Sequence, residues 1–358
     1  MRPEFFIGID ISSFSQVPTR TINPENLLEY QRFKDVAGKK AVSIDLPTVD
    51  AAALLAEDER ERKMDIPERF GKALDVDIDL SKSGTWETVP GGRIWRVQIN
   101  APGAKTINMI FDRFFLPEGA QVFVTNAERT MVSGPIDVTQ NNEYRKYSTS
   151  LIKGSSMLIE LYEPESVKTQ SELHISKVIH GYKLTPFAGF GESAPCNENV
   201  TCQAFAAWQD EANMVAMVLL QDNTRWCSGS LLNNACQNFR PNFLTAFHCL
   251  DNNGNGVADQ GEITAAQNWQ FMFQYISPQC NPSVNDPNFF TFSGSTFRAG
   301  WNVSDFALVE LNQRPTASSG IRYAGWSRAT TAPTSSASLH HPKGDVMKVS
   351  IDWVFRRS

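Results

Sequence analysis

The chain has 358 residues, of which 41% are hydrophobic, and its net charge at pH 7 is −6. This length allows two domains with ordinary packed cores. Acidic and basic residues are mixed along the chain without a basic run, which argues against a nucleic acid partner. The longest apolar run, Met214–Leu220, is the length of a strand and too short to cross a membrane, so no membrane partner is predicted.

Residues 1–70 form a polar and charged N-terminal segment. A short helix is predicted around 50–63, where apolar and charged residues mix in the sequence DAAALLAEDERERK. We interpret it as a surface helix or a linker and assign no chemistry to this segment.

Residues 71–183 carry short runs rich in Val, Ile and Phe that are separated by turn signals. The clearest runs are RIWRVQIN (93–100), INMIFDRFFLP (107–117), AQVFVTN (120–126) and SSMLIELYEP (155–164). Strands and turns at this spacing predict an antiparallel β-sandwich. The Gly- and Pro-bearing segment 184–195, LTPFAGFGESAP, then indicates a linker to a second domain.

Residues 196–358 return to strand-like patterns, so the whole chain is predicted to be all-β. The predicted strands lie at 214–221, 227–233, 242–249, 268–276, 305–312 and 347–355. We expect no substantial helix after residue 183.

All six cysteines lie between Cys196 and Cys280, and the first 195 residues contain none. This clustering favours disulfides within one domain, hence an oxidising compartment and a secreted protein. A zinc site is the alternative, but no CxxC pair occurs and only one histidine, His248, lies among the cysteines. Residues 1–13 lack the apolar core of a signal peptide, so we expect the true start to lie upstream.

Three local features indicate nucleophilic catalysis. His248 directly follows a predicted strand in the sequence TAFHC, and Asp305 opens the apolar strand DFALVEL. Cys227 begins the strand CSGSLL and could form a disulfide with Cys249, next to the histidine. A serine hydroxyl becomes a strong nucleophile only when an imidazole accepts its proton, and a carboxylate must hold that imidazole in one tautomer. A disulfide beside the histidine would restrict its position, to which the rate is sensitive.

These motifs resemble those of chymotrypsin-like serine proteases, and most closely the bacterial lysyl endopeptidases. The shared pieces are PCNENVTC (195–202), CSGSLLNN (227–234), NFLTAFHC (242–249), SGST (293–296), SDFALVEL (304–311), AGW (324–326) and HHPKGDVMKVS (340–350). The resemblance implies that His248 is the general base and that Asp305 orients it. It also implies a disulfide between Cys202 and Cys280 and a two-barrel protease domain of which mainly the first barrel is present. Residues 70–183 resemble, more loosely, the propeptides of such proteases.

The chain departs from the family where the nucleophile should be. The family's GxSGS-type loop follows the HHP motif at a distance, so we expect the nucleophilic serine to lie beyond Ser358 and the chain as given to be inactive. Neither Ser228-Gly229-Ser230 nor Ser293-Gly294-Ser295 fits the role. The resemblance places the partner of Cys196 beyond the chain end, and Cys236 has no counterpart.

The segment Asp251–Glu262, DNNGNGVADQGE, satisfies the calcium-loop pattern D-x-[DN]-x-[DN]-G-x5-E. The predicted ligands are Asp251, Asn253, Asn255, the carbonyl of Val257, Asp259 and Glu262. A polar surface turn is the alternative, because position eight is an alanine and no helix is predicted before the loop. We interpret His340 and His341 as packed residues and not as metal ligands.

Together these observations predict a bacterial zymogen fragment with four parts: a polar segment (1–70), a β-sandwich prodomain (71–183), a linker (184–195) and a trypsin-like serine protease domain (196–358). The predicted enzyme is a secreted, monomeric endopeptidase that acts on protein or peptide substrates, with no cofactor required for catalysis. Activation is expected to cut between Lys183 and Cys196, at Lys183 if the specificity is for lysine. The alternatives are a non-catalytic secreted β-sandwich binding protein and an intracellular β protein with free thiols.

Overall fold

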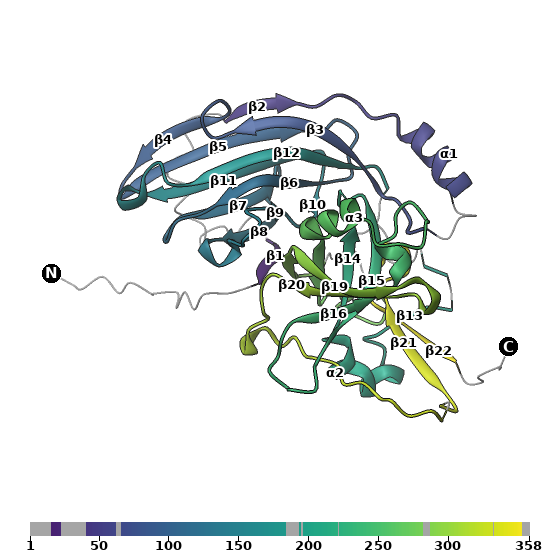
Figure 1. Ribbon diagram of the computed structural model, residues 1–358. Helices are drawn as coiled ribbons and strands as arrows, with labels where there is room; N and C mark the ends of the chain where they lie inside the picture. The colour runs from purple at the N-terminus through teal and green to yellow at the C-terminus, as the bar shows by residue number, and fades with distance from the viewer. Residues whose placement is uncertain are drawn as a thin grey trace.

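The computed structural model describes residues 16–22, 41–61, 66–183, 193–194, 196–220, 222–281, 287–331 and 333–352. Strands dominate this part of the chain, which confirms the all-β class (Figure 1). None of its helices is long and apolar enough to span a membrane. Of the predicted linker, only residues 193 and 194 are described. We call residues 41–183 the N-terminal half and residues 193–352 the C-terminal half.

The N-terminal half is built from two packed sheets. The first contains β2 (Val42–Asp45), β4 (Thr85–Val89), β5 (Gly92–Asn100), β7 (Gln121–Asn126), β8 (Met131–Ile136) and β11 (Ser156–Pro164). The second contains β3 (Gly71–Asp79), β6 (Thr106–Phe115), β9 (Tyr147–Ser148), β10 (Ile152–Lys153) and β12 (Glu172–Gly181). Alternate residues of β11, Met157, Ile159 and Leu161, are buried in one core with Met109 and Phe111 of the second sheet. This arrangement is the sandwich that the alternating pattern predicts.

The C-terminal half contains a second group of antiparallel strands. They are β14 (Val215–Leu220), β15 (Arg225–Leu232), β16 (Asn242–Thr245), β17 (Gln270–Phe273), β18 (Phe289–Ser293), β19 (Ser295–Trp301) and β20 (Phe306–Leu311). Their order is β19-β20-β16-β15-β14-β17-β18. The strands at the two ends of this path, β18 and β19, are separated only by Gly294, whose φ of +79° favours glycine. The core of this group contains Phe243, Phe271 and Phe292.

Smaller elements complete the structure. A third sheet contains β13 (Glu198–Asn199), β21 (Ser336–His340) and β22 (Lys348–Asp352). The α-helices are α1 (Ala51–Glu61), α2 (Gln209–Ala212) and α3 (Gln260–Ala265). The short 3₁₀ helices are η2 (Val138–Gln140), η3 (Glu165–Val167), η4 (Gln203–Trp208), η5 (Phe247–Cys249), η6 (Ala266–Asn268), η7 (Asn302–Ser304), η8 (Ala317–Ser319) and η9 (Pro342–Gly344). Helix α1 occupies the predicted helical segment, and the helices after residue 183 are short, as expected.

The N-terminal segment differs from the polar surface segment that we predicted. Its strand β1 (Val17–Thr21) lies between β8 of the N-terminal half and β18 of the C-terminal half, so one sheet runs through both (Figure 1). The strand is polar because its neighbours are polar: the buried Thr19 hydroxyl hydrogen-bonds the hydroxyls of Ser133 and Ser150. Buried polar groups are tolerated when they are paired in this way.

Candidate active site

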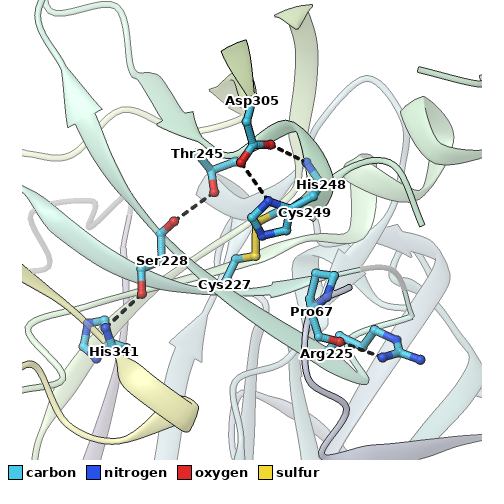
Figure 2. The surroundings of a disulfide bond; sticks show 9 residues. All are labelled: Pro67, Arg225, Cys227, Ser228, Thr245, His248, Cys249, Asp305 and His341. Atoms are coloured by element: carbon cyan, nitrogen blue, oxygen red, sulfur yellow. Dashed lines mark hydrogen bonds and ion pairs between the residues drawn. A yellow bond between two sulfur atoms is a disulfide. The ribbon is translucent and has the colours of Figure 1, made fainter. Parts of the chain in front are cut away.

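His248 is held at the end of a buried strand. Strand β16 ends at Thr245, and the chain then turns through η5, which contains the histidine. Phe247 and Cys249 on either side are buried, whereas the His248 side chain is 36% exposed. Cys249 forms a disulfide with Cys227 of β15, and the Thr245 hydroxyl donates to the carbonyl of Ser228 at 2.8 Å (Figure 2). The ring therefore projects from a backbone that is fixed on both sides.

Asp305 is brought to His248 by the adjacent strand. Strand β20 pairs with β16, and Asp305 stands directly before β20, at the end of η7. Its backbone is left-handed, with φ 49° and ψ 45°, a conformation that aspartate adopts more readily than most residues. One carboxylate oxygen accepts the His248 backbone N–H at 2.9 Å, and the other lies 2.9 Å from His248 Nδ1 (Figure 2).

This contact determines what the imidazole can do. If Nδ1 donates to the carboxylate, the neutral ring presents Nε2 as an acceptor on its opposite side, which is the arrangement of a general base. Partial burial acts to raise the pKa of Asp305, but the hydrogen bonds from the backbone and ring of His248 outweigh it and place this pKa below its usual value. Asp305 is therefore ionised at neutral pH and can stabilise a protonated imidazole.

Three serines of the two SGS segments, 228–230 and 293–295, have partners other than His248. Ser228 Oγ accepts the backbone N–H of His341 at 2.8 Å. Ser293 Oγ accepts the N–H of Ser148, and Ser295 Oγ donates to the carbonyl of Ala266. Among the described residues, the hydrogen bonds of the His248 ring go to Asp305 alone.

The structure contains two disulfides, the same two pairs that the sequence suggested. Besides Cys227–Cys249, Cys202 is bonded to Cys280, which ties the start of η4 to the segment after β17. Cys196 and Cys236 are exposed and unpaired. The only described group of three His, Cys, Asp or Glu residues with ligand atoms within 4.8 Å of one another is Cys227, His248 and Cys249. Two of these three are bonded to each other, and His340 and His341 belong to no such group.

The loop Asp251–Glu262 is tightly folded through its own carboxylates. Asp251 accepts the backbone N–H groups of Asn255 and Gly256 at 3.1 and 2.7 Å, and Gly256 has the positive φ (+77°) expected at the sharp turn. Glu262 accepts the N–H of Asn252 and that of Asp259 at 2.7 and 3.0 Å. Helix η5 precedes the loop, although no helix was predicted there, and α3 begins inside it. Turn and helix positions fit a calcium loop, but the three carboxylates do not converge on one point.

The sequence did not identify the residues that hold the strands behind the His248–Asp305 pair. Thr245 and Ser228 link β16 to β15, and the N–H of His341 reaches Ser228 from a segment more than a hundred residues later. Thr245 lies in the TAFHC motif and could have been noticed there. No local signal connects His341 with Ser228.

Two comparisons with known proteins found similar sequences. Residues 190–356 match the family model of the lysyl endopeptidase C-terminal domain. The chain is also 27% identical over 304 residues to a protein of Pseudomonas aeruginosa named lysyl endopeptidase. That alignment covers 78% of this chain and 62% of the relative, so the chain spans less than two thirds of the relative's length.

Proposed function

Because this chain is lysyl endopeptidase-like, we propose that it is part of a secreted bacterial serine endopeptidase made as a zymogen, with the N-terminal half as prodomain. The observation that supports this best is the double contact of Asp305 with the backbone and ring of His248. The two disulfides agree with secretion. Specificity for lysine is part of the proposal and rests on the similarity alone.

In the proposed mechanism, His248 Nε2 accepts the proton of a serine hydroxyl as that hydroxyl attacks the substrate carbonyl. The imidazolium formed in this step is stabilised by Asp305 and then donates its proton to the leaving amine. Water, activated by the same imidazole, afterwards hydrolyses the acyl-enzyme. We assign the nucleophile to the family's GxSGS-type loop and not to Ser228, Ser293 or Ser295, none of which is hydrogen-bonded to His248.

The proposal is tested with a chain extended to include the candidate serine loop. We expect it to hydrolyse a lysyl ester and to be labelled by a fluorophosphonate, and His248→Ala should lower kcat by several orders of magnitude without unfolding the protein. The matched control is His340→Ala, because the ring of His340 is hydrogen-bonded to the carbonyl of Ser338, at 3.4 Å, and not to His248 or Asp305. Absence of both turnover and labelling in the extended chain would favour the non-catalytic binding protein.

We propose further that Asp251–Glu262 binds a structural calcium ion. The ion would be held by Asp251, Asp259 and Glu262 together with the neutral oxygens of Asn253, Asn255 and Val257. Asp251 and Glu262 are both buried, and binding would replace the N–H donors that now neutralise them. The ion would order the segment after His248 and take no part in the reaction.

A further inference from the structure

Lys183, at the border of the predicted linker, is held against helix α1. Its Nζ lies 3.0 Å from Asp58 Oδ2, and its side chain is only 16% exposed. The hydroxyl of Tyr182 donates to the same Asp58 oxygen at 2.8 Å. The centroid of the Trp226 ring lies 6.0 Å from the same Nζ. Lys183 therefore has partners from α1 and β15, and its neighbour Tyr182 shares the same Asp58 oxygen.

Asp58 is the centre of this contact. It is 8% exposed, and its other oxygen accepts Arg69 Nε at 2.9 Å. Arg69 in turn pairs with Glu57 of the same helix at 2.9 Å. Burial acts to raise the pKa of Asp58, but hydrogen bonds from Tyr182, Lys183 and Arg69 outweigh it and lower the pKa. The carboxylate is thus charged at neutral pH and attracts the ammonium group of Lys183 in a poorly hydrated place.

The backbone that leads to Lys183 is fixed as well. The N–H groups of Tyr182 and Lys183 both point to the carbonyl of Phe70, at 3.0 and 3.3 Å. Just before them, His180 and Gly181 pair with β3 on one side and β6 on the other. A protease cuts a folded chain only after the residues around the cleaved bond have opened locally. Cleavage after Lys183 therefore requires the end of β12 to separate from the sheet. It also requires the Lys183 side chain to separate from Asp58.

The sequence after Lys183 determines where a lysine-directed protease can separate the two halves. Residues 184–195 contain neither lysine nor arginine. For a lysine-directed protease, Lys183 is consequently the last point of attack before Cys196 and the disulfide-bonded half. The most suitable processing residue thus has a side chain that is only 16% exposed.

We propose that α1 restricts the access of proteases to Lys183. A lysine-directed protease can then separate the two halves only after the contact between Lys183 and Asp58 of α1 has broken. In the cleavage, water adds across the peptide bond that follows Lys183, which leaves a carboxylate on Lys183 and an amino group on the next residue. The role in zymogen activation rests on the proposed function, whereas the restricted access to Lys183 is a property of the fold. The N-terminal segment, to which the sequence assigned no chemistry, would then control activation.

The test uses the full chain and a lysyl endopeptidase added from another source, with cleavage at each lysine followed by mass spectrometry. Lys168, in an exposed turn with a side chain 45% accessible, serves as the internal standard. In the wild type we expect the cut after Lys168 to be much faster than the cut after Lys183. Asp58→Asn should accelerate the cut after Lys183 about tenfold and leave that after Lys168 unchanged, because one charge-assisted contact is lost.

The control is Asp210→Asn, which neutralises an exposed carboxylate that is paired with Arg322 in the C-terminal half. It should change neither rate. If Asp58→Asn unfolds the chain, which would accelerate both cuts together, Tyr182→Phe removes only the hydroxyl donor and should still raise the Lys183-to-Lys168 rate ratio. Equal rates at the two lysines in the wild type, or an unchanged ratio in both variants, would overturn the proposal. Because the protease is added, these outcomes do not depend on whether this chain belongs to an enzyme.

Discussion

At the scale of single residues, the candidate site depends on one carboxylate that serves two donors. Asp305 accepts the backbone N–H of His248 with one oxygen and lies within hydrogen-bond distance of its ring with the other. The same residue therefore fixes where the histidine backbone lies and how its ring is turned. Each donor faces a different carboxylate oxygen, and an asparagine has an NH₂ group in place of one of them, so it cannot accept both hydrogen bonds in this geometry.

Asp305→Asn should consequently lower kcat by about 10⁴-fold in an extended, active chain. If the amide oxygen accepts the backbone N–H, the amide NH₂ faces Nδ1 and favours the tautomer with a proton on Nε2, which cannot act as a base. Initial rates on a lysyl ester measure the effect, and circular dichroism verifies that the variant is folded. Turnover within tenfold of the wild type would remove Asp305 from the mechanism.

His341 should make the stability depend on pH. The ring is buried, and this burial lowers its pKa to about 4 although Nδ1 donates to the carbonyl of Asp345. Between this value and the unfolded pKa of about 6.5, the unfolded chain binds more protons than the folded one, so stability falls as the pH is lowered through this window. The full contribution is about 3 kcal/mol. Urea unfolding at pH 7 and pH 4.5 measures it.

His341→Gln should remove this part of the pH dependence. The comparison variant is His174→Gln, because Asp112 and Asp77 outweigh the effect of burial on His174 and raise its pKa. A raised pKa stabilises the protein at low pH, and this stability is lost as the pH rises, so removing His174 should steepen the acid loss. An identical pH dependence in wild type and His341→Gln would show that His341 is not responsible.

At the scale of elements, the sequence predicts what a local pattern encodes. Alternating residues predict the strands of both halves, and a motif beside a strand end predicts the positions of His248 and Asp305. Strand β1 is missed because its sequence, VPTRT, is short and polar and becomes buried only between partners far away in the chain. The contact between α1 and Lys183 is missed for the same reason: a charged helix predicts a solvated surface unless its distant partners are known.

The loop Asp251–Glu262, inside which α3 begins, provides the prediction at this scale. With two asparagines among its early ligands, we expect a calcium dissociation constant of about 10⁻⁴ to 10⁻³ M. Calcium at a hundredfold excess over this constant should add about 2.7 kcal/mol to the free energy of unfolding. Thermal unfolding of the full chain, with and without calcium, measures this as a rise in Tm that magnesium does not reproduce.

Glu262→Gln should abolish the calcium response of the loop, and Gln260→Ala, a change outside the ligand positions, should preserve it. Glu262 also caps α3, so its loss lowers Tm even without calcium. For this reason the quantity to compare is the shift that calcium causes and not Tm itself. If calorimetry detects no calcium binding at millimolar concentrations, the loop is a polar turn.

At the scale of the whole molecule, the two halves are joined by more than the linker. One hydrophobic core contains Val97 and Ile159 of the N-terminal half and Met217, Leu219 and Phe289 of the C-terminal half. Strand β1 adds hydrogen bonds in both directions, because Thr19 is opposite Ser133 of β8 and Phe289 of β18. The packing thus continues across the boundary that composition predicts at residues 184–195.

The halves should therefore remain together after the linker is cut, with β1 supplying part of the binding energy. This is tested by inserting the recognition site of a sequence-specific protease between residues 184 and 192, cutting the folded chain and separating the products by size exclusion. We expect the wild-type halves to elute together.

In Thr19→Pro the halves should dissociate at least about tenfold more readily, because proline removes an N–H from a strand that is paired on both sides. Ser43→Pro is the control: β2 pairs with β5 alone among the described strands, so the same substitution there leaves the contact between the halves intact. If the halves of Thr19→Pro stay together as firmly as those of Ser43→Pro, the shared core alone holds the prodomain and β1 is dispensable.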